Sequence, residues 1–297
     1  MNELNPKNKL NEQVEIKPSE YVTVTDMGHI IEIQHMEKKN RSVHIRKLDK
    51  ERYVLLETGE IKEFEKSQNR SENENSLRQT FKKMRYLINN NFKGNPNELH
   101  ITMTYAENMT DTERLYSDFK RFMTRLRRKY KGQSIDYLNV IEPQQRGAWH
   151  VHMLIRFNDL KSVYISNKDL ADMWEQGFLT IKSLKDVDNI GAYLSAYLSD
   201  IEVPEGREVS NSKEVVIKRV DGQEKRFLKG GRLWMYPPGM NLFRKSKGIV
   251  YPERKEMSYR EIKKVVGSAK PHYQKSYKVE KEDFSNTITY EQYNLKR

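Results

Sequence analysis

Residues 142–157 have the sequence EPQQRGAWHVHMLIRF, and this stretch decides the fold that we expect for the chain. From Trp149 to Phe157 the side chains alternate with a period of two, as in a strand with one buried face. His150 and His152 lie on one face. The opposite face is entirely apolar and consists of Trp149, Val151, Met153, Ile155 and Phe157. The pattern therefore predicts a β-strand that holds two imidazoles side by side.

A carboxylate is expected beside these histidines. An apolar run, residues 135–141, ends at Glu142, and a turn signal follows at Arg146. If the two runs form a hairpin that folds near Arg146, Glu142 lies opposite His150. Gln144 takes its place if the register shifts by two residues. Two histidines and one carboxylate are a ligand set for a divalent metal ion.

Composition narrows the classes of partner. The 297 residues include 54 Lys and Arg against 42 Asp and Glu, which gives a net charge of +12, and there is no cysteine. This excess favours an anionic partner, nucleic acid before a membrane surface. No apolar run is long enough for a transmembrane helix, and residues 1–6 lack the apolar core of a signal peptide. We therefore expect a cytoplasmic protein with no membrane partner, in which any metal is held by nitrogen and oxygen atoms.

The pattern along the chain predicts three regions. Residues 1–75 contain short alternating runs and then a polar stretch, which indicates a β-rich extension with a small β-meander and a linker. Residues 76–205 form the core, which begins with a helix near Ser76. Residues 206–297 form a basic C-terminal region with a hairpin, an aromatic loop and a tail.

The core has the order strand, helix, strand, strand, helix, strand, helix. This is the order of a split β-α-β unit, so we expect an α+β fold of ferredoxin-like type: an antiparallel sheet with helices on one face. His100 lies on the first strand of the core, and nothing in its spacing connects it to the metal ligands. We expect His100 to be structural.

The last helix of the core carries two tyrosines. Tyr193 and Tyr197 are four residues apart, so both lie at the same edge of the apolar stripe. Tyrosines at this spacing are typical of a helix that closes a core. A phenol at the edge of a stripe can also point its hydroxyl into a cleft, and the helix alone does not decide between these alternatives.

Together, three motifs resemble those of the HUH endonucleases, and within them the two-tyrosine rolling-circle replication initiators (Rep) of plasmids and phages. Residues 101–105, ITMTY, resemble the strand of the first motif. His150 and His152 resemble the histidine motif, and residues 193–197, YLSAY, resemble the two-tyrosine form of the third motif. Their order and approximate spacing also agree, over about residues 99–200.

The resemblance implies a DNA nicking and joining enzyme. A tyrosine attacks a backbone phosphate of single-stranded origin DNA, which leaves a 5′-phosphotyrosine and a free 3′-hydroxyl primer; strands are rejoined at termination. Tyr193 is expected to attack first, with Tyr197 as the second or alternate nucleophile. Mn²⁺ or Mg²⁺ at His150, His152 and Glu142 offsets the phosphate charge. A host helicase and a host DNA polymerase are implied partners, because the chain has no G-x-x-x-x-G-K-[ST] motif.

One feature departs from the family pattern. Many members carry a lysine beside or after the nucleophilic tyrosine, where this chain has Ala196 and Asp200. Lys182 or Lys185 is close enough in the sequence to supply that charge.

The DNA surface is expected to be basic and aromatic. Arg121, Arg125 and Arg128 recur on the outer face of one helix, where they either follow phosphates or form an ordinary solvated face. Trp234 and Tyr236 either stack on bases or pack under a Pro-rich loop.

Two other functions remain open from the sequence. The same nicking chemistry serves a mobilisation relaxase or a transposase. A DNA-binding control protein without catalysis would bind single strands and form no covalent product.

Overall fold

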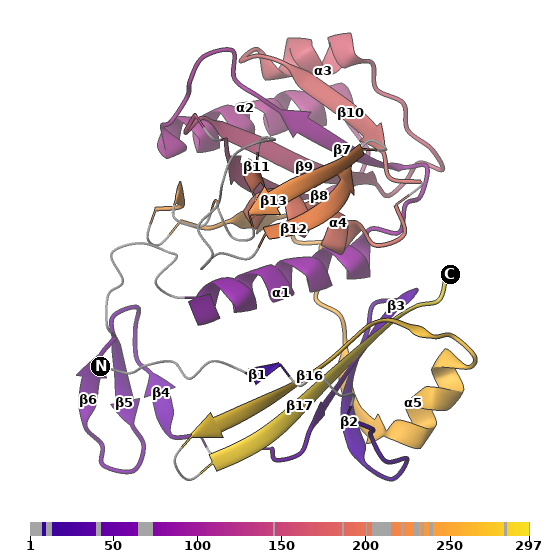
Figure 1. The fold of residues 1–297 in the computed structure, drawn as a ribbon. Helices are drawn as coiled ribbons and strands as arrows, with labels where there is room; N and C mark the ends of the chain where they lie inside the picture. Colours follow the sequence, from indigo (N-terminus) through magenta and orange to yellow (C-terminus); the bar gives the residue numbers. More distant parts are fainter. Residues whose placement is uncertain are drawn as a thin grey trace. The chain divides into compact units, whose positions relative to one another are not determined.

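Figure 1 shows a computed structural model of the chain, which describes residues 8–9, 14–39, 43–64, 74–144, 146–185, 187–199, 201–203, 215–220, 223–228, 232, 235–237, 240–281 and 284–296. The chain forms two compact units. The first joins Met1–Gln68 to Glu253–Arg297, and the second is Asn69–Pro252. The histidine strand belongs to the second unit.

The second unit is built on a five-stranded antiparallel sheet with the order β10-β7-β9-β8-β14. Its strands are β7 (Glu98–Met103), β8 (Ile135–Pro143), β9 (Trp149–Phe157), β10 (Leu179–Ser183) and β14 (Phe243–Lys245). Helix α2 (Thr112–Lys129) connects β7 to β8, and α3 (Asn167–Trp174) connects β9 to β10. Because β9 pairs antiparallel with both β7 and β8, the α+β class and the split β-α-β order are confirmed.

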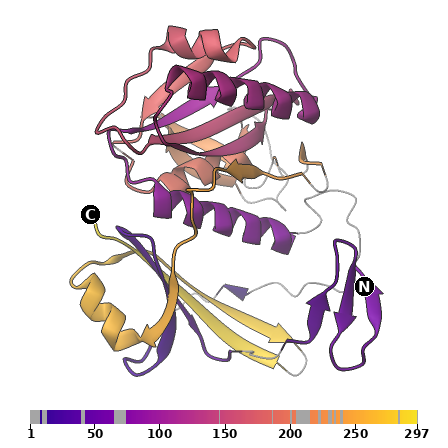
Figure 2. The same ribbon diagram turned by 180° about the vertical axis from the view of Figure 1, so that it is seen from behind.

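Helices cover both faces of this sheet (Figures 1 and 2). Helices α2 and α3 pack on the apolar face of β9 in one buried cluster. On the histidine face, α1 (Glu74–Asn91) and α4 (Ile190–Ser199) join Leu138, Val140 and Leu154 in a second cluster. The structure thus corrects the expectation of helices on one face: these three apolar side chains also have to be removed from water. What remains of the histidine face is the end that carries the histidines.

Local sequence explains where the helices of this unit begin and how closely they pack. Helix α2 starts after Asp111, whose carboxylate accepts hydrogen bonds from the backbone N–H groups of Glu113 and Arg114. Helix α1 starts at Glu74, two residues before the predicted start. Helix α4 approaches α1 closely at Gly191, where a Cβ would come within 2.8 Å of the Asn89 side-chain oxygen. The same oxygen accepts a hydrogen bond from the Gly191 N–H at 2.8 Å.

A small three-stranded sheet completes the second unit. Strands β12 (Val215–Val220) and β13 (Gln223–Leu228) form the predicted hairpin, and β11 (Ile201–Val203) pairs with β13. Among the described helices of the chain, none is long and apolar enough to cross a membrane.

The first unit contains a six-stranded sheet with the order β1-β16-β17-β3-β2-β15. Its strands are β1 (Asn8–Lys9), β2 (Tyr21–Asp26), β3 (Ile30–Met36), β15 (Arg254–Ser258), β16 (Pro271–Lys281) and β17 (Phe284–Asn294). Helix α5 (Tyr259–Val266) begins with a capping box between Ser258 and Glu261 and buries Ile262 and Val266 against β2 and β3. Strands β4 (Ile45–Lys47), β5 (Arg52–Leu55) and β6 (Ile61–Glu63) form the predicted meander.

This arrangement divides the chain differently from the three regions expected from the sequence. The tail from residue 253 pairs with the N-terminal strands: β15 pairs with β2, and β17 pairs with β3. Residues 206–252 remain with the histidine sheet, where β14 pairs with β8. The two ends of the chain therefore build one unit around the insertion of the other.

Candidate metal centre

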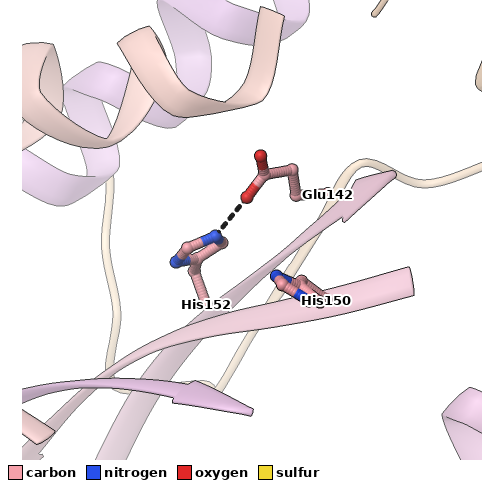
Figure 3. Close-up of side chains that lie close together, drawn as sticks. All are labelled: Glu142, His150 and His152. Atoms are coloured by element: carbon pink, nitrogen blue, oxygen red, sulfur yellow. Dashed lines mark hydrogen bonds and ion pairs between the residues drawn. The ribbon is translucent and has the colours of Figure 1, made fainter. Parts of the chain in front are cut away.

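The β8–β9 hairpin brings the three predicted metal ligands together. Glu142 on β8 lies directly opposite His150 on β9, and Val140 lies opposite His152. Glu142 and both histidines therefore point to the same side of the sheet, as Figure 3 shows. This is the register expected from the sequence. Gln144, the alternative ligand, forms part of the turn, where its backbone N–H donates to the carbonyl of Ala148.

The ligand atoms of Glu142, His150 and His152 all lie within 4.8 Å of one another. His152 Nε2 is 2.5 Å from Glu142 Oε2. Glu142 and His152 are buried, with 5% and 6% of their surfaces exposed, and His150 is half-buried. Among the residues that the structure describes, this is the one group of at least three such side chains close enough to hold an ion.

Burial keeps the imidazoles neutral, as metal ligands have to be. It lowers the pKa of His150 and of His152 to about 4, well below the ordinary value of 6.5. The neighbouring His152 and Arg146 lower the pKa of His150 further, and Lys182 does so for His152. At neutral pH each ring therefore keeps a nitrogen lone pair.

A second layer of side chains fixes the His152 ring. His152 Nδ1 lies 3.2 Å from His100 Nε2 and 3.2 Å from Thr102 Oγ1, on the neighbouring strand β7. With Nδ1 held there, Nε2 is the nitrogen that faces Glu142, an arrangement common around metal-binding histidines. His100, expected to be structural, thus contacts a candidate ligand. The signal was its position in the sheet, which pairs Thr102 with His152.

His100 also connects the cluster to the tyrosine helix. Its ring packs against Tyr193 of α4 edge-to-face, with ring centroids 6.1 Å apart. The site residues His152, His100 and Tyr193 therefore form one chain of ring contacts from β9 to α4. Tyr197 lies in the same helix, and its side chain is outside the described part of the structure.

Arg232 is the contact that the sequence did not predict. Its guanidinium forms an ion pair with Glu142 Oε1, and its Nη1 also donates to the carbonyl of Pro143 at 3.2 Å. Arg232 is 90 positions from Glu142 in the sequence and follows no periodic pattern, so sequence spacing carries no signal for it.

Lys182 lies at the edge of the same site. It is opposite His100 on strand β10, and its charge lowers the pKa values of His100 and His152. Lys185, the other lysine considered from the sequence, is exposed on the turn after β10. Of the two, the structure places Lys182 beside the histidines.

The three arginines predicted to contact DNA are not brought to this site. They lie on α2, which packs on the opposite face of the sheet. Arg121 forms an ion pair with Asp118, and Arg125 pairs with Glu175 and donates to the Met173 carbonyl at 2.8 Å. Arg128 is exposed.

The two predicted base-stacking aromatics have different outcomes. Tyr236 is buried, its ring packs beside Trp149, and its hydroxyl donates to the Ile141 carbonyl at 3.0 Å. It is a core residue, which corrects the base-stacking alternative. Trp234 lies outside the described residues.

Comparison with known proteins gives one match. Residues 98–202 match the model of a family of replication-associated proteins, described as the ORF2 type. The matched segment begins at β7, contains Glu142, His150 and His152, and ends within β11. No curated protein and no solved structure matches the chain significantly. The match supports a protein that initiates DNA replication.

Proposed function

We propose that this protein is a rolling-circle replication initiator that nicks single-stranded origin DNA with a tyrosine nucleophile. The observation that carries the proposal is the convergence of Glu142, His150 and His152, with Tyr193 one ring away. The replication-associated family match over residues 98–202 supports the biological setting, and the net charge of +12 fits an anionic substrate.

The residues present fit a divalent ion. Two neutral imidazoles and a carboxylate suit Mn²⁺ or Mg²⁺, and donors bound at ~2.1 Å to one ion lie about 3 to 4 Å apart. The ligand atoms are already within 4.8 Å of one another, so small side-chain rotations suffice. When bound, the ion would polarise a phosphate oxygen and stabilise the negative charge that grows during attack.

Tyr193 supplies the nucleophile in this proposal. Its hydroxyl oxygen attacks the phosphorus, and the bond between phosphorus and the 3′ oxygen breaks. The phenol proton passes to water, and the departing 3′ oxygen takes up a proton to become the 3′-hydroxyl. His100 orients the Tyr193 ring through their edge-to-face contact. Lys182, opposite His100, adds positive charge where the phosphate would lie.

Tyr197 would make the second cut after one round of synthesis. It is one turn of α4 from Tyr193, so either hydroxyl can be presented from the same helix. The bond energy kept in the phosphotyrosine allows the strand to be rejoined. A host helicase and a host polymerase would separate and copy the strands.

A cleavage assay tests the proposal. End-labelled single-stranded oligonucleotides from the protein's own replicon are incubated with the protein and Mn²⁺, then separated on a denaturing gel. We expect a protein–DNA adduct on the 5′ side of the nick, absent with His150→Ala/His152→Ala and strongly reduced with Tyr193→Phe. Binding without an adduct, across several metals and origin segments, would instead indicate a non-catalytic DNA-binding protein.

A further inference from the structure

The two oxygens of Glu142 have different partners. Oε2 faces the His152 Nε2 atom, which carries a lone pair available to a metal. Oε1 is held by the Arg232 guanidinium, which is always protonated and has no lone pair to offer. The carboxylate is therefore shared between a group that can bind a cation and a group that is itself a cation.

The charges of the cluster balance without a metal. The histidines are neutral, so the single negative charge of Glu142 is compensated by the single positive charge of Arg232. A divalent ion added to this arrangement would leave an excess of two positive charges in a largely buried site. Such an excess is costly where the effective dielectric constant is low. Either Arg232 moves away or an anion enters with the metal.

Arg232 is held by few contacts, which allows it to move. Its side chain is 16% exposed, so it reaches the surface. Apart from Glu142, its one other hydrogen bond among the described residues is to the Pro143 carbonyl. Its Nε atom is buried and has no hydrogen-bond partner in the described part of the chain. A guanidinium with an unsatisfied buried donor loses little when it leaves, and gains if it finds a phosphate.

We propose that Arg232 is an exchangeable counter-ion of the metal site. It holds the Glu142 carboxylate while no metal is bound, a divalent cation displaces it, and the freed guanidinium then binds a phosphate of the single-stranded DNA. The displacement requires only the metal site; the phosphate contact rests on the proposed function. Arg232 thus couples metal loading to DNA binding, without taking part in bond breaking.

Metal affinity without DNA tests the displacement. The dissociation constant of Mn²⁺ is measured by electron paramagnetic resonance for the wild type, Arg232→Met and Arg232→Lys. We expect Arg232→Met to bind Mn²⁺ about tenfold more tightly or better, because a competing cation is gone, and Arg232→Lys to stay near the wild type. Arg226→Met removes an exposed arginine of β13 and should change nothing. An unchanged or weaker affinity in folded Arg232→Met would overturn the displacement.

Thermal unfolding keeps this test independent of folding defects. Without metal, Arg232→Met should melt below the wild type, because Glu142 is left buried and unpaired. Saturating Mn²⁺ should raise its melting temperature more than that of the wild type. If Arg232→Met does not fold even with Mn²⁺, Arg232→Gln, which is uncharged but keeps hydrogen-bond donors, gives the same two readouts. An equal rise in both proteins would contradict the exchange.

Salt dependence of DNA binding tests the phosphate contact. In a Tyr193→Phe/Tyr197→Phe background with saturating Mn²⁺, the affinity for a single-stranded oligonucleotide is followed against salt concentration. Loss of one phosphate contact in Arg232→Met should reduce the logarithmic slope by about 0.7. An unchanged slope would overturn this part alone. Absence of any covalent adduct in the wild type would refute the nicking function and leave the metal result standing.

Discussion

Each unit of the protein buries a glutamate, and the two differ in what surrounds the carboxylate. Glu291 in the first unit is 4% exposed and accepts hydrogen bonds from Tyr259 at 3.0 Å, Tyr293 at 2.6 Å and Gln274 at 3.2 Å. Glu142 in the second unit is 5% exposed and lies among neutral imidazoles and one weakly held guanidinium. Burial of the two carboxylates is therefore the same, while their chemistry is not.

The difference shows how a structural carboxylate is distinguished from a candidate ligand. Burial and the charge of Glu291 raise the pKa of Tyr259 to about 12 and also raise that of Tyr293, so both phenols remain protonated donors. Lys263 Nζ donates to the Tyr293 hydroxyl at 3.0 Å and extends the network. Around Glu142 the neighbours are groups with free lone pairs. A buried carboxylate becomes a metal site when its neighbours can share a cation.

The largest expected effect comes from changing these two glutamates in parallel. Glu142→Gln removes the one anionic ligand, so we expect at least a hundredfold loss of adduct, on the order of the loss of a catalytic metal. Glu291→Gln should leave the adduct yield unchanged, because Glu291 belongs to the other unit. The gel assay with equal protein concentrations measures both. Equal losses in the two variants would break the comparison.

Glu291→Gln should instead affect stability. The amide has the shape of the carboxylate but lacks its charge, so the phenol hydrogen bonds weaken. We expect the free energy of unfolding to fall by about 1 to 3 kcal/mol. Urea denaturation monitored by circular dichroism measures this change, with Glu261→Gln at the exposed cap of α5 as the control. A wild-type midpoint in Glu291→Gln would show that the network is not stabilising.

The histidine cluster should make the fold sensitive to acid. Burial lowers the pKa of His100 to about 3 and those of His150 and His152 to about 4. In the unfolded chain these rings take up protons below pH about 6.5, while the folded chain resists protonation. Their contribution is therefore intact above pH about 6.5 and is lost as the pH falls toward 4.

The expected slope is up to about 1.4 kcal/mol per pH unit for each buried histidine. Urea denaturation at several pH values between 4 and 7 measures it. His100→Gln should reduce the slope, and His44→Gln, at an exposed position of the meander, should not. Equal slopes in the wild type and His100→Gln would show that the imidazole does not resist protonation.

The smallest effect is expected for the arginines of α2. Arg121 and Arg125 are paired with carboxylates, and the helix packs on the face opposite the histidines. Changing Arg121, Arg125 and Arg128 to glutamine should weaken single-strand binding less than about threefold at physiological salt, where exposed charges are screened. Fluorescence anisotropy with a labelled oligonucleotide checks this. A tenfold loss would place DNA on α2.

The site was predictable to the extent that it is local. The alternation of β9, the turn near Arg146 and the run before Glu142 together fix a hairpin, and one hairpin register brings three ligands together. Asp111 likewise marks the start of α2 by its side-chain chemistry alone. Neighbours in sequence are sufficient for these features.

The remaining features depend on contacts distant in sequence. Arg232 comes from a segment without periodicity, and His100 meets His152 only because β7 pairs with β9. The cover of Leu154 by α1 and α4, and the pairing of β17 with β3, are also decided by packing between distant segments. Local patterns do not encode such pairings, because any apolar strand offers the same edge to many partners.

Peptide mapping of the covalent product tests the central claim most directly. The protein is incubated with origin DNA and Mn²⁺, digested with nuclease and protease, and analysed by mass spectrometry for a nucleotide-bearing tyrosine. The account predicts the modification on α4, at Tyr193 after the first cut, and its loss in Glu142→Gln. A modified residue outside α4, or a modification that persists in Glu142→Gln, would contradict it.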